Sequence, residues 1–492
     1  MKIIIFLSTC IALFACKPQP QQQQEAVPPQ EGYEIKLHVA KMAGKDAMLA
    51  FYQNDDNRVG VCDTVHLDSA GYGVFRRPDR RLGRGLYLIY FPSGNMIQLL
   101  IGSQQYFTVT SDTTDYINTL VFENSPENTE FIEYQKFLQT QEKKMQEIEE
   151  EFSKETEPDE AVREKYAKRQ DAIDEEVRAR VAGIRKQYPG TVLANFLNFT
   201  LSPKIPDYSK TVAADAPDRE NEIRRLSLYY LKKHYWDYTD LTDTMFFRIK
   251  EFKPKLDRYF TTLIIPNPDT LYEACVSIIE KARPNKTMFR YLTEYCIMHA
   301  FNHEIMGMDK AFVRLGERYY LSGEADWRTA ESQKQLTDEI YKRQYNLLGN
   351  TALDLKLPSL EGGVVSLLET QAPYTLLLFW EPNCGHCKTV VPDVKKEIFD
   401  RFGPHGLKVF AVMTLTEKKE WEAFVEKNQL FDFINCYDPN RQSNYWTIYN
   451  VFSTPVLYLL DKDKKIIAKQ LSVEQLVGLL REEYKRKGIE VR

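Results

Sequence analysis

A nearly unbroken apolar run, Tyr374–Trp380, ends four residues before a pair of cysteines, Cys384 and Cys387. Apolar runs of this length are typical of a strand that is buried on both faces, in a sheet covered by helices. Pro382 keeps the junction after the run non-helical, and the residues after Cys384 have the pattern of a helix. The passage from buried strand to helix therefore restricts this part of the chain to an α/β layer fold.

The rest of the C-terminal third continues this pattern. We expect a hairpin at 353–367, strands at 407–413, 456–460 and 465–468, and helices at 391–402, 418–428 and 473–485. These elements complete one α/β domain, which we place at residues 346–492.

The cysteine pair has a spacing that supports thiol chemistry. Cys384 precedes the helix, where free N–H groups and the helix dipole stabilise a thiolate, so we assign it as the attacking sulfur. Cys387 lies one turn away and can resolve a mixed disulfide. The imidazole of His386 favours the Cys384 thiolate, which stabilises the reduced pair and makes its disulfide more oxidising.

A second motif, Ser453-Thr454-Pro455, stands directly before the predicted strand at 456–460. A proline at a strand start fits a cis peptide bond. The cis form would leave the backbone of Thr454 open to pair with an extended substrate. We therefore assign Thr454 and Pro455, together with Trp380, to substrate binding.

Metal sites are an alternative use of the same residue types. A Cys-x-x-Cys zinc site needs two more ligands, and the nearby Cys436 and His405 form no second closely spaced pair. Cys296, His299 and His303 share one helix face, but no fourth ligand is evident. We interpret them as core or interface histidines beside a buried thiol, and we predict neither a metal nor another cofactor.

The N-terminus has the pattern of an export signal. A short positive start precedes an apolar stretch that is too short to span a bilayer, and Leu13-Phe14-Ala15-Cys16 resembles a lipobox. We expect loss of residues 1–15, a lipid on Cys16 and a Pro/Gln-rich tether at 16–31, with a reach of roughly 20 to 45 Å. We therefore predict a lipid-anchored protein that faces the periplasm. Lys17, directly after the cysteine, favours its transfer to the outer membrane.

Between the tether and the α/β domain, the hydrophobic period changes once. Short alternating runs over residues 32–125 predict a β-sandwich-like domain. Residues 126–345 have a helical period, which begins with two long charged helices that should form an antiparallel hairpin. Residues 188–345 carry no catalytic motif and have the pattern of an all-α packing module.

Composition and the remaining cysteines narrow the class of protein. The formal net charge of -5 gives no reason to expect nucleic acid. Cys62, Cys275, Cys296 and Cys436 are scattered, which indicates buried apolar thiols rather than a disulfide framework. The sequence leaves open whether Cys275 and Cys296 form a disulfide.

The stretch Phe379–Lys388, with Thr454-Pro455 farther along, resembles the thioredoxin-like family, and most closely its TlpA/ResA branch of envelope-anchored proteins. The domains ahead of it resemble uncharacterised N-terminal domains of thiol:disulfide interchange lipoproteins. Two acids of the family are missing, because Leu378 and Val390 occupy their positions. Both acids are thought to assist proton transfer to the resolving thiol.

The resemblance implies an enzyme, a thiol–disulfide oxidoreductase that reduces or isomerises disulfides in exported proteins. A membrane or periplasmic thiol would supply the electrons, and the direction of flow stays open. A thiol peroxidase is a weaker alternative, because Glu381 and Leu377 stand where that branch needs Thr or Ser and Pro. A tethered binding or scaffold protein with a redox-sensing domain is the non-enzymatic alternative.

Overall fold

A computed structural model of the protein describes residues 31–53, 58–112, 115–414, 418–438, 440 and 442–491. The predicted signal, the predicted lipidation site Cys16 and the predicted tether up to residue 30 lie outside the described residues. The described chain forms two compact units, one from residues up to Phe51 with Gly60–Glu147, the other from Tyr52–Val59 with Ile148 onward. The predicted domain boundaries at 125/126 and 345/346 stay predictions.

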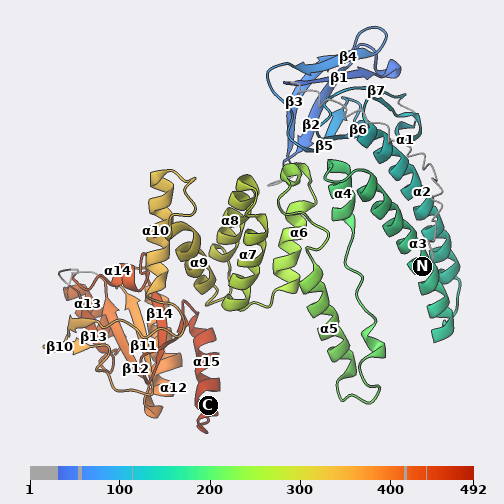
Figure 1. The fold of residues 1–492 in the computed structure, drawn as a ribbon. Coiled ribbons are helices and arrows are strands. Elements are labelled where there is room, and N and C mark those ends of the chain that lie inside the picture. Colours follow the sequence, from blue (N-terminus) through green and yellow to red (C-terminus); the bar gives the residue numbers. More distant parts are fainter. Residues whose placement is uncertain are drawn as a thin grey trace, which may run out of the picture. The chain divides into compact units, whose positions relative to one another are not determined.

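The first unit begins with two four-stranded sheets, which are drawn in blue in Figure 1. Their strand orders are β4-β1-β7-β8 and β3-β2-β5-β6, and β1 pairs antiparallel with β4 and parallel with β7. The strands are β1 (Tyr33–His38), β2 (Asp46–Tyr52), β3 (Val59–His66), β4 (Tyr72–Arg77), β5 (Gly85–Tyr90), β6 (Met96–Ile101), β7 (Tyr106–Thr110) and β8 (Val121–Glu123), with the short helices η1 (Ala40–Met42) and α1 (Tyr116–Thr119).

Alternation along the strands builds the core between these sheets. On β1, Tyr33, Ile35 and Leu37 point inward and are essentially unexposed, while the residues between them face solvent or the edge. They join one apolar cluster with Leu49 of β2 and Ile89 of β5. The predicted β-sandwich-like region is confirmed.

Two helices of 28 residues follow, α2 (Pro126–Ser153) and α3 (Glu160–Gln187). Asp159 caps α3 by accepting from the Val162 N–H. Near the turn between the two helices, the rings of Phe152 and Tyr166 pack edge to face at 5.1 Å. These contacts across the turn are those of the predicted hairpin.

A set of shorter helices fills the region up to residue 345. They are α4 (Val192–Thr200), η2 (Tyr208–Lys210), α5 (Arg219–His234), η3 (Thr244–Arg248), α6 (Phe252–Arg258), η4 (Tyr259–Leu263), α7 (Pro268–Ala282), α8 (Lys286–Phe301), α9 (Asp309–Leu315), η5 (Gly316–Leu321) and α10 (Ala330–Gln344). The all-α prediction for this region is confirmed. Within the described part of the chain, no helix combines the length and the apolar character that crossing a bilayer requires.

The C-terminal region contains a five-stranded mixed sheet of order β13-β12-β11-β14-β15 (Figure 1, orange and red). The central strand β11 pairs parallel with β12 and antiparallel with β14. The strands are β11 (Tyr374–Trp380), β12 (Lys408–Met413), β13 (Ile434–Tyr437), β14 (Val456–Asp461) and β15 (Ile466–Lys469), preceded by a hairpin of β9 (Lys356–Pro358) and β10 (Val364–Ser366).

Helices bury β11 on both faces. The helices are α11 (Cys387–Asp393), η6 (Val394–Phe399), α12 (Asp400–Phe402), η7 (Gly403–His405), α13 (Lys418–Lys427), α14 (Tyr445–Ile448) and α15 (Val473–Arg486). Leu376 and Leu378 lie in the cluster that includes α11, α13 and α15, whereas Leu377 and Phe379 lie in the cluster that includes α14. The predicted α/β domain is confirmed, and its central strand begins and ends as predicted.

Candidate functional site

Three segments meet where β11 ends. The chain leaves β11 at Trp380, passes buried Pro382 and begins α11 at Cys387, with Cys384 between them. The loop before β14 brings Thr454 to the same place, because β14 runs antiparallel beside β11. The Thr454–Pro455 peptide bond is cis, as the sequence predicted.

Cys384 is half-buried and has backbone partners on both sides. Its Sγ lies 3.4 Å from the N–H of Cys387, which donates to it, and 3.2 Å from the carbonyl oxygen of Thr454, to which the thiol donates. The first contact favours the thiolate and the second favours the thiol. The sulfur is thus held at a fixed position between the start of α11 and the loop before β14.

The balance of these effects favours ionisation of Cys384. Burial is the largest single influence and opposes the thiolate. Hydrogen bonds from the Cys387 N–H and thiol, from the Thr454 side chain and from the His386 N–H together outweigh it, so the pKa of Cys384 lies below its ordinary value of 9.0. A sulfur of this kind can act as a nucleophile near neutral pH.

Cys387 has the opposite environment. Its side chain is completely buried and packs among the residues that cover β11. Burial first, and then the neighbouring Cys384 sulfur, raise the pKa of its thiol to about 12, although hydrogen bonds from the Glu381 backbone and the Thr454 side chain act in the opposite direction. Both cysteines are free, so the structure holds the dithiol form of the pair.

His386 takes part through its backbone. It is the N-cap residue of α11, its side chain is exposed, and its N–H is one of the donors to the Cys384 sulfur. The predicted effect of the imidazole on the cysteine pair stays a prediction.

A cavity of about 430 Å³ opens beside Cys384. Its walls come from the ends of β11 and β12, from α14 and from the loop before β14: Glu381, Cys384, Thr414, Tyr445, Val451, Phe452, Ser453 and Thr454. Phe452 is 60% exposed, which gives the rim a large apolar surface. Thr454 is therefore placed as predicted, next to the sulfur and on an open cavity. Thr414 and Tyr445 were not predicted, since they come from separate segments with no shared motif, and Phe452, directly before the Ser453-Thr454-Pro455 motif, was not predicted either.

The prediction that Trp380 contacts substrate is wrong. Its side chain is completely buried, in the same cluster as Leu376, Leu378 and Cys387, and its ring packs on Phe424 at 4.8 Å. Alternate residues of a strand point to the same face, so Trp380 follows Leu376 and Leu378 into the core. Its role is to pack beneath the cysteine pair.

The cysteines and histidines considered as zinc ligands are not assembled in one place. In the described ranges, no group of three or more His, Cys, Asp or Glu residues could hold a metal ion. The Cys436 thiol is buried on β13 and donates to the Ala411 carbonyl oxygen at 3.6 Å. Burial holds the pKa of Cys436 well above its ordinary value, which disfavours the thiolate that zinc requires.

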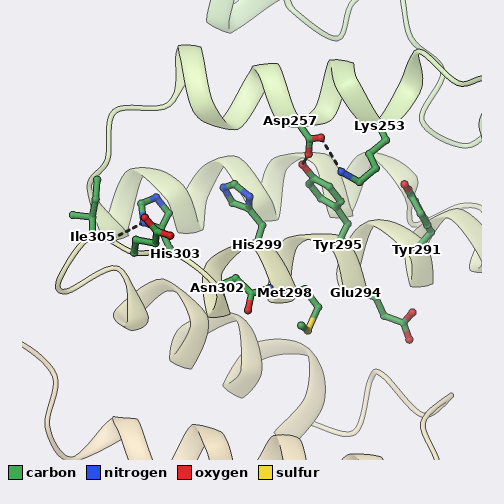
Figure 2. Close-up of a pocket in the computed structure, with 11 residues that line it drawn as sticks. Lys253, Asp257, Tyr291, Glu294, Tyr295, Met298, His299, Asn302, His303 and Ile305 are labelled. Atoms are coloured by element: carbon green, nitrogen blue, oxygen red, sulfur yellow. Dashed lines mark hydrogen bonds and ion pairs between the residues drawn. The ribbon is translucent and has the colours of Figure 1, made fainter. Parts of the chain in front are cut away.

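His299 and His303 line a separate cavity of about 730 Å³, shown in Figure 2. Tyr295 of α8 points toward Asp257 of α6 and donates to it at 2.6 Å (Figure 2). Helix α8 ends at Phe301, so His303 lies beyond it, and the prediction that His303 shares a helix face with Cys296 and His299 is wrong. Its Nδ1 accepts from the Ile305 N–H at 3.2 Å, which in the neutral ring leaves the proton on Nε2 and no lone pair for a metal.

A buried central strand that leads into a helix-capped dithiol, beside a cis-proline, defines the thioredoxin-like class of domain. The model of the AhpC/TSA family matches residues 348–469, so the C-terminal domain belongs to this thioredoxin-like family. The model described as a domain of unknown function (DUF5106) matches residues 187–342, within the helical region. No curated protein matches the chain.

Several solved structures are similar to parts of the chain. A domain of a possible thiol-disulfide isomerase from Cytophaga hutchinsonii shares 32% identity, and the match covers 29% of this chain and 96% of that one, with a TM-score of 0.27. A thioredoxin-like protein from Bacteroides caccae shares 21% identity over 57% of this chain and 97% of that one, with a TM-score of 0.44. The thioredoxin domain of a thiol-disulfide oxidoreductase from Bacteroides vulgatus shares 23% identity over 28% of this chain and 96% of that one, with a TM-score of 0.26.

Proposed function

We propose that this protein is a thiol–disulfide oxidoreductase of the cell envelope that reduces or isomerises disulfides in exported proteins. The observation that carries the proposal is the asymmetry of the pair. Cys384 is accessible and its thiol has a lowered pKa, whereas Cys387 is completely buried and its thiol has a raised one. Attack and resolution are thereby assigned to different sulfurs.

The proposed exchange has two steps. The Cys384 thiolate attacks one sulfur of a substrate disulfide, which breaks the S–S bond, forms a mixed disulfide and releases a substrate thiolate. Cys387 then loses its proton and attacks the Cys384 sulfur, which releases the second substrate thiol and leaves a Cys384–Cys387 disulfide. Two electrons pass from the pair to the substrate, and a membrane or periplasmic dithiol returns them.

Resolution becomes easier once the mixed disulfide has formed. Part of the raised pKa of Cys387 comes from the hydrogen bond and the charge of the neighbouring Cys384 sulfur. Both influences disappear when Cys384 carries the substrate, so the pKa of Cys387 should fall at the stage where its thiolate is needed. This effect supports resolution by Cys387 although Leu378 and Val390 replace the family's acids.

The envelope location rests on the N-terminal sequence. The lipobox ending at Cys16 and the tether at 16–31 support a lipid-anchored protein that faces the periplasm, with Lys17 favouring the outer membrane. Its partners would be exported proteins with thiols or disulfides, and the near-balanced charge supports no nucleic-acid role.

The test follows the thiol-dependent reduction of insulin by the full chain and by three single variants. Cys384→Ser should abolish turnover, and Cys387→Ser should stop at a trapped mixed disulfide. The control Cys62→Ser, which changes a half-buried thiol outside the pair, should keep full activity. Activity that survives Cys384→Ser would refute the proposal and favour a binding or scaffold protein.

Two further measurements address what the insulin assay leaves open. Hydrogen peroxide in place of insulin tests the peroxidase alternative. Equilibration of the cysteine pair with a glutathione series gives the direction of electron flow.

A further inference from the structure

A cavity of about 440 Å³ lies in the helical region, where the end of α4, the end of α5 and helix α6 meet. Apolar atoms form most of its wall, with side chains from Phe199, Leu201, Leu231 and Tyr235. The Tyr235 hydroxyl donates to the Lys255 carbonyl oxygen at 3.0 Å, which holds this ring against α6. Concave and largely apolar cavities of this size are typical of sites for small organic molecules. The cavity shares no residue with the one beside Cys384.

The half-buried side chain of Lys255, on α6, brings a positive charge to this wall. Its Nζ donates to the Phe199 carbonyl oxygen at 3.2 Å and lies 4.4 Å and 5.7 Å from the ring centroids of Phe199 and Tyr235. These partners are all neutral, and within the described part of the chain no carboxylate pairs with Lys255. Burial therefore lowers the pKa of Lys255 to about 8, and no neighbouring acid raises it.

The contact with Phe199 has a structural use, but it does not satisfy the ammonium. The Phe199 carbonyl group lies in the last turn of α4, where a cation stabilises the helix. This contact uses one of the three N–H donors of Lys255. The charge itself is not neutralised, and a cation removed from water costs free energy until an anion compensates it. The side chain is thus prepared to receive an anion from the cavity.

The other charged residues at the cavity agree with an anionic ligand. Among the described residues that line it, Lys255 and Arg258 are basic and Glu251 is acidic. Glu251 is exposed and pairs at 3.8 Å with Lys250, which does not line the cavity. Arg258 is exposed one turn along α6 from Lys255, where it favours the approach of an anion.

We propose that this cavity binds a small organic monocarboxylate, with its carboxylate on the Lys255 ammonium and its apolar body against Phe199, Leu201 and Leu231. One half-buried positive charge matches one negative charge, which favours a carboxylate over a phosphate. The volume is near the lower end of the range for ligand sites, which suits a body of medium length. The proposal goes beyond the thiol–disulfide function and does not depend on the cysteine pair.

The test is isothermal titration calorimetry of the full chain with two acids, octanoate and 3-phenylpropionate, at pH 7. At least one acid should bind, and comparison of the two distinguishes an aliphatic from an aromatic source of the carboxylate. Octanamide, the neutral analogue of octanoate, should bind at least about tenfold more weakly, because it offers no charge to Lys255. Octyl phosphate tests the preference for a single negative charge.

Three variants assign the binding to this cavity. Lys255→Met keeps the length of the side chain and should lower the affinity for the acid about 10- to 100-fold, while the affinity for octanamide stays unchanged. Leu231→Trp fills the cavity from a partly exposed position on α5 and should weaken the binding of both compounds. The matched control Lys281→Met removes the same charge from an exposed position of α7 outside the cavity and should bind as the unchanged chain does.

Equal affinities for octanoate and octanamide, an unchanged affinity in Lys255→Met, or no binding of either acid at millimolar concentration would overturn the proposal. Tighter binding of octyl phosphate than of octanoate would overturn the preference for a carboxylate. Circular dichroism checks that the variants fold, and Leu231→Trp provides the test if Lys255→Met does not. Cys384→Ser should bind the acid as the unchanged chain does, so failure of this site and failure of the redox function are separate results.

Discussion

Replacing Cys384 by serine should leave a cysteine at the site, Cys387, that hardly reacts with iodoacetamide near neutral pH. With a pKa of about 12 instead of the ordinary 9.0, its thiolate population at pH 8 falls on the order of a thousandfold. Part of that rise comes from Cys384 and disappears in the variant, so a reduction of at least about tenfold is expected from burial alone.

The mirror variant, Cys387→Ser, should behave in the opposite way. Its Cys384 should be alkylated with a midpoint below pH 9.0, because the backbone N–H groups of Cys387 and His386 still stabilise the thiolate. The two variants therefore differ both in rate at pH 8 and in the position of the pH–rate curve.

The assay is a pH series of iodoacetamide alkylation on the fully reduced protein, read by mass spectrometry of the cysteine peptides. The double variant Cys384→Ser with Cys387→Ser gives the background, in which half-buried Cys62 is the other accessible thiol among the described residues. Equal rates at pH 8 in the two single variants would refute the argument from burial. A Cys384 midpoint above pH 9.0 would refute the argument from the helix start.

Three further predictions concern the folded scaffold. Hydrogen bonds from Arg283, Tyr319 and Arg318 hold the pKa of Glu280 at about 2, so its stabilising contribution is complete above its ordinary value of 4.5 and is lost as the pH falls toward 2. Glu280→Gln should therefore flatten the free energy of unfolding against pH in that window, as measured by urea titration, and an unchanged slope would contradict this. Ser472 forms a capping box with Gln475 at the start of α15. Ser472→Ala should therefore lower the free energy of unfolding by about 1 kcal/mol, and Ser472→Gly by only a few tenths of that. Equal losses for the two variants in chemical denaturation would argue against the cap. Cys275 and Cys296 are completely buried and their thiols are hydrogen-bonded. Alkylation of the native protein should therefore label neither cysteine, whereas alkylation of the denatured protein should label both. Early labelling of either cysteine in the native protein would show that α7 and α8 separate.

The sequence predicted best those elements whose apolar residues can be buried in only one way. Strand β11 begins and ends as predicted because all seven of its residues are buried, and only a strand covered on both faces satisfies that run. By contrast, β13 (Ile434–Tyr437) and α14 (Tyr445–Ile448) were not predicted. Each has four residues, too few to show a hydrophobic period, and tertiary packing holds both in place.

The site was predictable where chemistry lies within one short motif. The sequence predicted the cysteine pair and the cis bond, because residue types at that spacing have few other uses. These residues are Cys384, Cys387, Thr454 and Pro455. Trp380 was misassigned because its nearness in the chain was taken as nearness to the substrate, whereas strand alternation sends it into the core. Phe452 was missed because its exposure depends on how the loop before β14 meets α14.

The complete burial of Cys387 has a kinetic consequence. In the proposed exchange, substrate and electron donor must both react at Cys384, since Cys387 has no surface that a second protein could reach. The two partners cannot occupy the site together, so the oxidised and reduced forms alternate as free species. Steady-state rates should then follow a ping-pong scheme, with parallel double-reciprocal plots and with each partner inhibiting the other at high concentration.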